Sequence, residues 1–201
     1  MCGLAGLFLP RGADVLSADM DAMLRVMVHR GPDGEARHTS PDGRYQVGFR
    51  RLAIIDLETG EQPIEDRQAG LVLTGNGEIY NYRELRQSYP DYPWQTTGDM
   101  ETVLPLVRDR GVDFVHGLNG MYALALYDAT AHRLTLVRDR LGVKPLYWAE
   151  LPGGGILFAS EIKALFASGL IRPAVFEPAV TAYLTHGWVP GPDTLFAGVR
   201  K

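Results

Sequence analysis

Short apolar runs recur along the chain and predict about eight strands. Their nearly continuous hydrophobic character is typical of strands that are covered on both faces, whereas a half-exposed strand alternates apolar and polar residues. The strand-like segments lie at residues 2–9, 45–49 and 52–55 (interrupted only by Arg50-Arg51), 71–74, 94–97, 121–127, 133–137, 146–148 and 156–159. A short link at 129–132 predicts that two of these runs form a hairpin.

Helical spacing of apolar residues predicts four helices among these strands. The first follows Ser17, its expected N-cap, and its apolar residues recur at i, i+3, i+4, i+7 and i+8 from Met20. A second helix is expected over 80–89, a third opens at 97–99, and a fourth is capped by Ser160. Strands and helices in this mixed order predict an α+β fold in which two sheets lie between helical layers.

The texture of the chain changes beyond Gly169. Four prolines fall in the remaining stretch, and only one short helix, 179–184, is predicted there. We therefore expect a domain over residues 2–170 and a linker over residues 171–201. Because no glycine cap or polar tail marks the end of the sequence, the linker is expected to lead into a missing C-terminal domain.

The composition is that of an ordinary globular protein, with 46% hydrophobic and 22% charged residues. A formal net charge of −4 and the absence of a Lys/Arg block argue against a nucleic acid partner. No run approaches the ~18 apolar residues of a membrane span, and no basic segment precedes the apolar start as in a signal peptide. We expect no membrane partner and a reducing cytoplasm as the location.

Common cofactor and metal sites have no signature in the sequence. The phosphate-binding patterns GxxxxGK and GxGxxG are absent. The five histidines lack ligand spacing, and a single cysteine excludes an internal disulfide or a Cys-rich zinc site. We expect no metal and no cofactor in this chain.

Cys2, the single cysteine, is the candidate nucleophile. Removal of Met1 would leave a thiol and a free α-amine on one residue. That amine titrates near pH ~8, so part of it is unprotonated at neutral pH and accepts the thiol proton. N-terminal threonine hydrolases use the same arrangement with a hydroxyl. The alternative is a small buried residue at the start of a strand.

Other polar segments suit a bound substrate, and each has a structural alternative. Arg50-Arg51 contains a candidate anchor for a carboxylate, or is a surface pair. Asn76-Gly77 predicts a tight turn whose amides also suit an oxyanion hole. Asp99 is either a helix N-cap or an acid at the edge of the site. His29-Arg30 fits a ligand or the C-terminus of a helix.

Eight ordered segments form a pattern that covers essentially residues 2–200. They are Cys2–Gly6, His29–Gly34, Arg51–Asp56, Asn76–Asn81, Gly98–Asp99, Met121–Asp128, Arg138–Tyr147 and Phe158–Lys163. Together they resemble the glutamine amidotransferase domain of asparagine synthetases, a class II amidotransferase domain with the N-terminal nucleophile hydrolase fold. The resemblance implies a four-layer α/β/β/α sandwich, in agreement with the layers predicted above.

The resemblance implies a reaction and its catalytic residues. Cys2 would attack the side-chain amide of L-glutamine, form a γ-glutamyl thioester and release ammonia, after which water frees the thiol. The Asn76 side chain and the Gly77 backbone N–H would hold the oxyanion, and both would border the bound glutamine.

The resemblance also implies how the glutamine zwitterion is bound. Arg51 would bind the α-carboxylate, while Glu78 and Asp99 would bind the α-ammonium group. The backbone of four consecutive residues would line the same pocket, namely Leu52, Ala53, Ile54 and Ile55. Arg50 stands where asparagine synthetases often carry an acid.

The implied partner is a C-terminal synthetase domain of the same polypeptide, which would use ATP and Mg²⁺ to amidate aspartate by default. Its SGGxDS-type loop is absent from this sequence. A homodimer is a further expected assembly. The alternatives are a non-aspartate acceptor, a catalytically silent regulatory or assembly module, and a stand-alone hydrolase of another amide.

Overall fold

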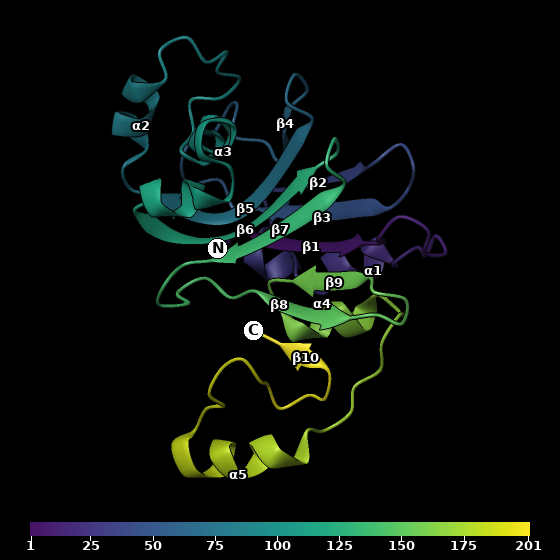
Figure 1. The fold of residues 1–201 in the computed structure, drawn as a ribbon. Helices are drawn as coiled ribbons and strands as arrows, with labels where there is room; N and C mark the ends of the chain where they lie inside the picture. The colour runs from purple at the N-terminus through teal and green to yellow at the C-terminus, as the bar shows by residue number, and fades with distance from the viewer.

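Two antiparallel sheets form the centre of the computed structural model, which describes residues 1–201 (Figure 1). The six-stranded sheet contains, in spatial order, β10 (Val199–Arg200), β8 (Tyr147–Glu150), β9 (Ile156–Ala159), β1 (Gly3–Phe8), β3 (Tyr45–Arg51) and β2 (Gly34–Thr39). The four-stranded sheet contains β4 (Ile64–Asp66), β5 (Leu71–Ile79), β6 (Gly120–Asp128) and β7 (Arg133–Arg138).

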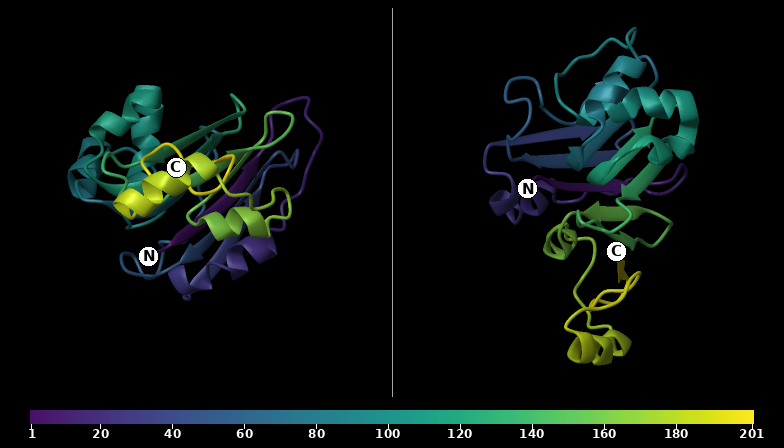
Figure 2. Two further views of the ribbon diagram at one scale, coloured as in Figure 1. Left: turned by 90° about the horizontal axis from the view of Figure 1, so that it is seen from below. Right: turned by 90° about the vertical axis from the view of Figure 1, so that its left-hand side faces the viewer.

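Helices cover the outer faces of the two sheets (Figure 1). The six-stranded sheet is covered by α1 (Met20–Arg25), the 3-10 helix η1 (Val28–Arg30) and α4 (Ile162–Ala167). The four-stranded sheet is covered by α2 (Tyr82–Ser88), η2 (Met100–Thr102), α3 (Val103–Arg110) and η3 (Gly111–Gly117). The last helix, α5 (Glu177–His186), projects away from both sheets (Figure 2).

Three hydrophobic clusters fill the spaces between the layers. One joins α1 and α4 to the six-stranded sheet, and a second joins α3 to the outer face of β5 and β6. The third lies between the sheets and includes Phe49 of β3 and Val72 of β5. Neighbouring residues of β5 alternate between clusters, since Leu73 faces the helices and Val72 faces the other sheet. This arrangement is the predicted α/β/β/α sandwich.

The predicted strand at 52–55 is wrong. β3 ends at Arg51 because its two neighbours begin there, with Gly3 of β1 opposite Arg50 and Gly34 of β2 opposite Arg51. Without a partner strand the chain leaves the sheet, and residues 52–60 form a loop. The predicted strand at 94–97 is also wrong, since those residues are irregular.

Two predicted caps and three strands also differ from expectation. Asp19, and not Ser17, caps α1, because its Oδ1 accepts the Ala22 N–H at 2.9 Å. Ser160 is buried and its Oγ accepts the Leu4 N–H of β1 at 3.0 Å, so it ties α4 to the sheet without capping it. The short or edge strands β2, β4 and β10 were not predicted, because they lack continuous apolar runs.

Residues 171–201 contain more structure than a linker requires. α5 is longer than the predicted 179–184, and β10 adds an antiparallel edge strand beside β8. Val199 of β10 is buried in the cluster under the six-stranded sheet. The division at residue 170 stays a prediction. No helix in the structure combines the length and apolar character needed to cross a bilayer.

Neighbouring atoms leave no space for a side chain at Gly6 of β1, so a substitution there tests the packing of the six-stranded sheet. A Cβ added there would lie 2.3 Å from Cζ of Phe158 and 2.7 Å from the carbonyl oxygen of Gln46. We expect Gly6→Ala to lower the free energy of unfolding by about 1–3 kcal/mol in urea titrations, because the strand has to shift. Gly34→Ala is the control, since its Cβ would meet only Arg51 Cβ at 3.5 Å, and a change above about 0.5 kcal/mol there would contradict this account.

Candidate active site

A cavity of about 690 Å³, including its open mouth, lies where one end of the six-stranded sheet faces β5. Nine of the ten predicted site residues line it, namely Cys2, Arg51, Leu52, Ile54, Ile55, Asn76, Gly77, Glu78 and Asp99. Ala53 is the exception, and its N–H donates to Oδ2 of Asp33 at 2.9 Å. Residues far apart in the sequence therefore meet in one cavity.

Cys2 directly precedes β1, and its side chain is held by the backbone of Leu52. The Leu52 N–H donates to Sγ at 3.3 Å, and Sγ lies 3.5 Å from the carbonyl oxygen of the same residue. Because β1 is buried in the middle of its sheet, the thiol is attached to a rigid element. Met1 also lines the cavity, so its removal would place the new α-amine there.

Arg30 fixes the backbone of the candidate nucleophile. The sequence alone suggested either a ligand contact or a helix C-terminus for this arginine. Its Nε donates to the carbonyl oxygen of Cys2 at 2.9 Å, and its Nη1 donates to Glu161 at 3.1 Å. His29 contacts the same carboxylate at 2.7 Å. The side chain of Arg30 is buried, and the only signal of this role in the sequence was the segment His29–Gly34 that contains it.

Asn76 and Gly77 lie within β5, and the predicted tight turn at this position is wrong. The ladder with β6 runs through both residues, with Asn76 opposite Ala123 and Gly77 opposite Tyr122. Asn76 is 1% exposed, and its Nδ2 is buried without a hydrogen-bond partner. A buried donor of this kind is costly, and an oxyanion bound in the cavity would satisfy it.

Gly77 has room for no side chain. An added Cβ would lie 2.1 Å from the carbonyl oxygen of Met121 on the neighbouring strand. Gly75, on the other side of Asn76 in the sequence, is fixed from the cavity side, where its N–H donates to Oε1 of Gln62 at 2.6 Å. The strand that carries Asn76 is therefore held close on both sides.

Alternation along β3 decides which arginine faces the cavity. Arg50 points to the helical side, where its Nε donates to the carbonyl oxygen of Leu24 at 3.1 Å and its Nη2 pairs with Glu35 at 2.5 Å. Arg51 lines the cavity and donates only to the carbonyl oxygens of Asp56 and Leu57. The Arg51 guanidinium has no carboxylate partner and is available for an anion.

Two carboxylates line the same cavity. Asp99 is buried, and its Oδ2 accepts the Ile79 N–H at 2.7 Å, so it does not cap the helix that follows. Burial raises the pKa of Asp99, and the nearby Glu78 adds to this effect, whereas the N–H of Ile79 opposes it. The unpaired Arg51 guanidinium and the two acids in one cavity offer partners for both charged ends of a zwitterion.

Lys144 is a cavity residue that the sequence did not indicate beyond its place in a charged loop. It is buried and forms no ion pair, and its N–H donates to Oδ2 of Asp139 at 2.9 Å. No group of three or more His, Cys, Asp or Glu side chains is arranged to hold a metal ion.

The model of the glutamine amidotransferase domain family matches residues 1–201. The chain belongs to this family. Asparagine synthetase 2 of Bacillus subtilis is 40% identical over 170 residues, which are 83% of this chain and 22% of that protein. Asparagine synthetase B of Escherichia coli is 39% identical over 167 residues, which are 82% of this chain and 30% of that protein. The chain thus spans less than a third of the length of these two relatives.

Other relatives of this amidotransferase domain extend the comparison. A protein of Gibberella zeae named amidase chry2 is 33% identical over 213 residues, which cover 100% of this chain and 31% of that protein. The glutamine phosphoribosylpyrophosphate amidotransferase of Bacillus subtilis superimposes with a TM-score of 0.67 at 19% identity, over 87% of this chain and 45% of that one. This likeness shows the N-terminal nucleophile hydrolase fold.

The raised pKa of Asp99 predicts a gain of stability in Asp99→Asn at neutral pH. The folded protein holds the Asp99 proton more tightly than the unfolded chain, whose carboxyl titrates near 3.8. The free energy of unfolding of the wild type therefore falls as the pH rises from 3.8 through the raised pKa of the folded state. We expect the variant to be at least as stable as wild type at pH 7 in urea titrations, with the difference shrinking as pH falls towards 3.8.

Asp139→Asn is the control of opposite sign. Burial alone would raise the pKa of Asp139, but the N–H groups of Lys144, Val143 and Tyr122 outweigh it and lower the pKa. Its stabilising contribution is present above the unfolded pKa of 3.8 and is lost on acidification. This variant is expected to be less stable than wild type at pH 7. A loss of stability at pH 7 in both variants would contradict the assignment for Asp99.

Proposed function

We propose that this domain hydrolyses L-glutamine through a thioester on Cys2 and releases ammonia. The observation that carries the proposal is one cavity that combines the Cys2 thiol, the unpaired Asn76 amide, and Arg51 with two carboxylates. This set supplies a nucleophile, an oxyanion donor and a complement to the zwitterion. The relatives named as glutamine-hydrolysing asparagine synthetases support the choice of substrate.

The chemistry begins after removal of Met1. The α-amine of Cys2 accepts the thiol proton, and the thiolate sulfur attacks the carbonyl carbon of the glutamine side-chain amide. Asn76 Nδ2 and the Gly77 N–H donate to the oxyanion that forms. The C–N bond breaks as the ammonium form of the amine protonates the leaving nitrogen, which departs as ammonia. Water, deprotonated by the same amine, then attacks the thioester carbonyl carbon. The C–S bond breaks, the ammonium form of the amine returns its proton to the Cys2 sulfur, and glutamate is released.

Substrate recognition follows from the charges in the cavity. The Arg51 guanidinium offers two parallel N–H groups to the α-carboxylate, a geometry that a single ammonium group does not provide. Glu78 and Asp99 accept hydrogen bonds from the α-ammonium group. The loop at 52–55 closes the pocket, with the backbone of Leu52 beside the nucleophile.

The released ammonia would serve an acceptor in a longer protein. We propose that residues 2–170 form the amidotransferase domain and that 171–201 lead into a synthetase domain of the same polypeptide, which would bind ATP and Mg²⁺ and amidate aspartate. Two relatives are named as asparagine synthetases, which supports aspartate, whereas a third is named as an amidase, which keeps a different acceptor carboxylate as the second candidate. We expect this assembly, alone or as a homodimer, in the cytoplasm.

The nucleophile is tested by intact mass and ammonia release. We expect the purified chain to lack Met1 and to gain one adduct on Cys2 from 6-diazo-5-oxo-L-norleucine, with loss of glutaminase activity in step. Cys2→Ser serves as the control and should take no label. A processed wild-type chain that is neither labelled nor active would instead indicate a catalytically silent module.

The oxyanion donor is tested by Asn76→Ala. Loss of one donor to an oxyanion costs about 10²–10³-fold in kcat, and we expect this loss with little change in KM, because the contact forms mainly in the transition state. Asn119→Ala is the matched control, since this exposed residue does not line the cavity. Equal activity of the two variants in steady-state kinetics would rule out the role of Asn76.

A further inference from the structure

Asp56 does not line the cavity, yet its carboxylate joins two loops that do. Its Oδ1 accepts the Thr59 N–H at 2.8 Å, and its Oδ2 accepts the Thr59 hydroxyl at 2.5 Å. The same Oδ2 accepts the Thr97 N–H at 2.9 Å, across 41 residues of sequence. One side chain thereby connects the loop at 52–60 with the segment that leads to Asp99.

The first loop positions Arg51. The carbonyl oxygen of Asp56 accepts a hydrogen bond from Nη2 of Arg51, and the carbonyl of Leu57 lies 3.4 Å from Nη1. The Asp56 carbonyl also accepts the Gly60 N–H at 3.1 Å. These bonds orient the only guanidinium that lines the cavity.

The backbone of this loop is tightly constrained around Asp56. Asp56 adopts a left-handed backbone conformation with φ of 53°, which is uncommon for a residue other than glycine. A Cβ on Gly60 would lie 2.6 Å from the carbonyl oxygen of Asp56. The carboxylate contacts to Thr59 and Thr97 hold the loop in this conformation.

The second loop positions Asp99. The Thr97 N–H donates to Asp56, and Gly98 packs against it, since an added Cβ would lie 3.5 Å from Oδ2 of Asp56. On its other side the segment is held by Glu101, whose carboxylate accepts the N–H groups of Gln95 and Thr96 at 2.8 and 2.7 Å. Asp99 itself is held by the Ile79 N–H, and the contact between Asp56 and Thr97 links the segment that leads to Asp99 with the loop that holds Arg51.

The Asp56 carboxyl is ionised at neutral pH. Burial alone would raise its pKa, but the donors of Thr59 and Thr97 outweigh that effect and lower the pKa to about 2. Hydrogen bonds to an ionised carboxylate are roughly twice as strong as neutral ones. The connection between the two loops is therefore a charge-assisted one.

We propose that Asp56 is a positioning residue that sets the spacing between Arg51 and Asp99, and thereby the selectivity of the cavity for an α-amino acid zwitterion. The inference rests on the proposed glutamine hydrolysis, because it assigns these two groups to the two charged ends of the substrate. Asp56 touches neither end and acts through the two loops. It is absent from the set of site residues predicted from the sequence.

The test compares Asp56→Ala with wild type in steady-state glutaminase kinetics. We expect KM for L-glutamine to rise about tenfold, because both charged contacts are misplaced, and kcat to change less than about twofold, because Cys2 is attached to the buried strand β1 and Asn76 lies within β5, and the Asp56 side chain contacts neither strand. Asp56→Asn retains one carbonyl acceptor and is expected to recover part of the affinity. Calorimetric titration of L-glutamine into the Cys2→Ala background gives the same comparison without turnover.

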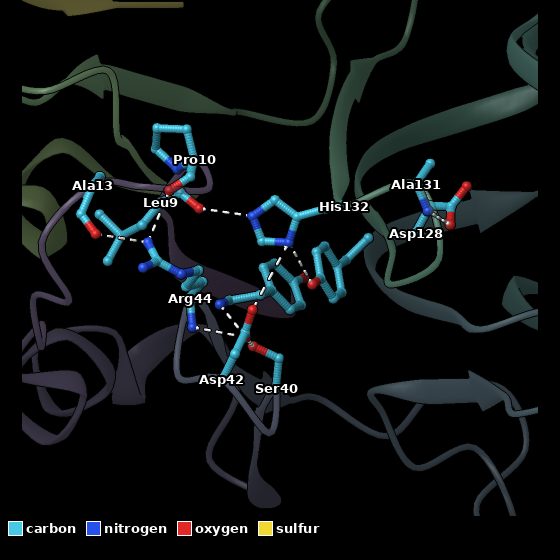
Figure 3. A network of polar contacts seen from close by, with 11 residues as sticks. Leu9, Pro10, Ala13, Ser40, Asp42, Arg44, Asp128, Ala131 and His132 are labelled. Carbon is cyan, nitrogen blue, oxygen red and sulfur yellow. Dashed lines mark hydrogen bonds and ion pairs between the residues drawn. The ribbon is translucent and has the colours of Figure 1, made fainter.

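Asp42 provides a matched control elsewhere in the molecule (Figure 3). Its carboxylate accepts the Ser40 hydroxyl at 2.6 Å and the Arg44 N–H at 3.1 Å, and these residues lie outside the cavity. The Ser40 hydrogen bond lowers the pKa of Asp42, so this carboxylate is also charged. Asp42→Ala removes comparable bonds and is expected to leave KM unchanged.

Two substrate analogues that each lack one charged group distinguish a loss of selectivity for the zwitterion from a general disruption of the cavity. Glutaramic acid lacks the α-ammonium group, and 4-aminobutanamide lacks the α-carboxylate. We expect Asp56→Ala to lower kcat/KM for L-glutamine about tenfold relative to either amide, because each of these uses only one side of the cavity. Equal losses on all three substrates would show a merely structural role and overturn the inference.

The outcomes also distinguish this inference from the proposed function. A wild type that hydrolyses L-glutamine, with KM unchanged in Asp56→Ala, overturns the role of Asp56 alone. A wild type that neither hydrolyses nor binds L-glutamine overturns both. A raised KM in the Asp42→Ala control would show that any loss of a loop carboxylate has this effect, and would also overturn the inference.

Discussion

The antiparallel pairing of β1 with β3 is the constraint on which the site depends. Its register places Gly3 opposite Arg50, so Cys2 lies beside the point where Arg51 leaves the sheet. A slip by one residue would turn every side chain of a buried strand to the wrong face, and two-sided burial makes such a slip costly. The candidate nucleophile and the expected carboxylate anchor are therefore positioned by the same hydrogen bonds that form the core.

The second sheet contributes through packing and has no strand in common with the first. The apolar cluster between the sheets holds β5 against β1 and β3, and at its end apolar residues give way to the buried amide of Asn76. A donor in this place costs stability, since no protein group satisfies it. This loss of stability has a functional explanation if the Asn76 amide is oriented in advance to donate to the oxyanion that forms only during the reaction.

Much of the fold and of the site was predictable from the sequence, and the errors have physical reasons. Buried strands such as β6 carry continuous apolar runs, whereas the edge strand β2 alternates and was missed. Ile54 and Ile55 have a strand-like composition, but no partner strand extends that far. The contacts of Arg30 and Asp56 depend on residues more than a hundred and about forty positions away, which local patterns do not encode.

Met1 lines the same cavity as Cys2, and this has a consequence for the purification of the protein. Any affinity tag fused ahead of Cys2 would convert the amine into an amide and fill the mouth of the pocket. Material prepared in that way would fold, since β1 begins only at Gly3, but it would lack the free amine that the proposed mechanism requires. A tag belongs at the other end of the chain, and the aminopeptidase of the expression host becomes part of the preparation.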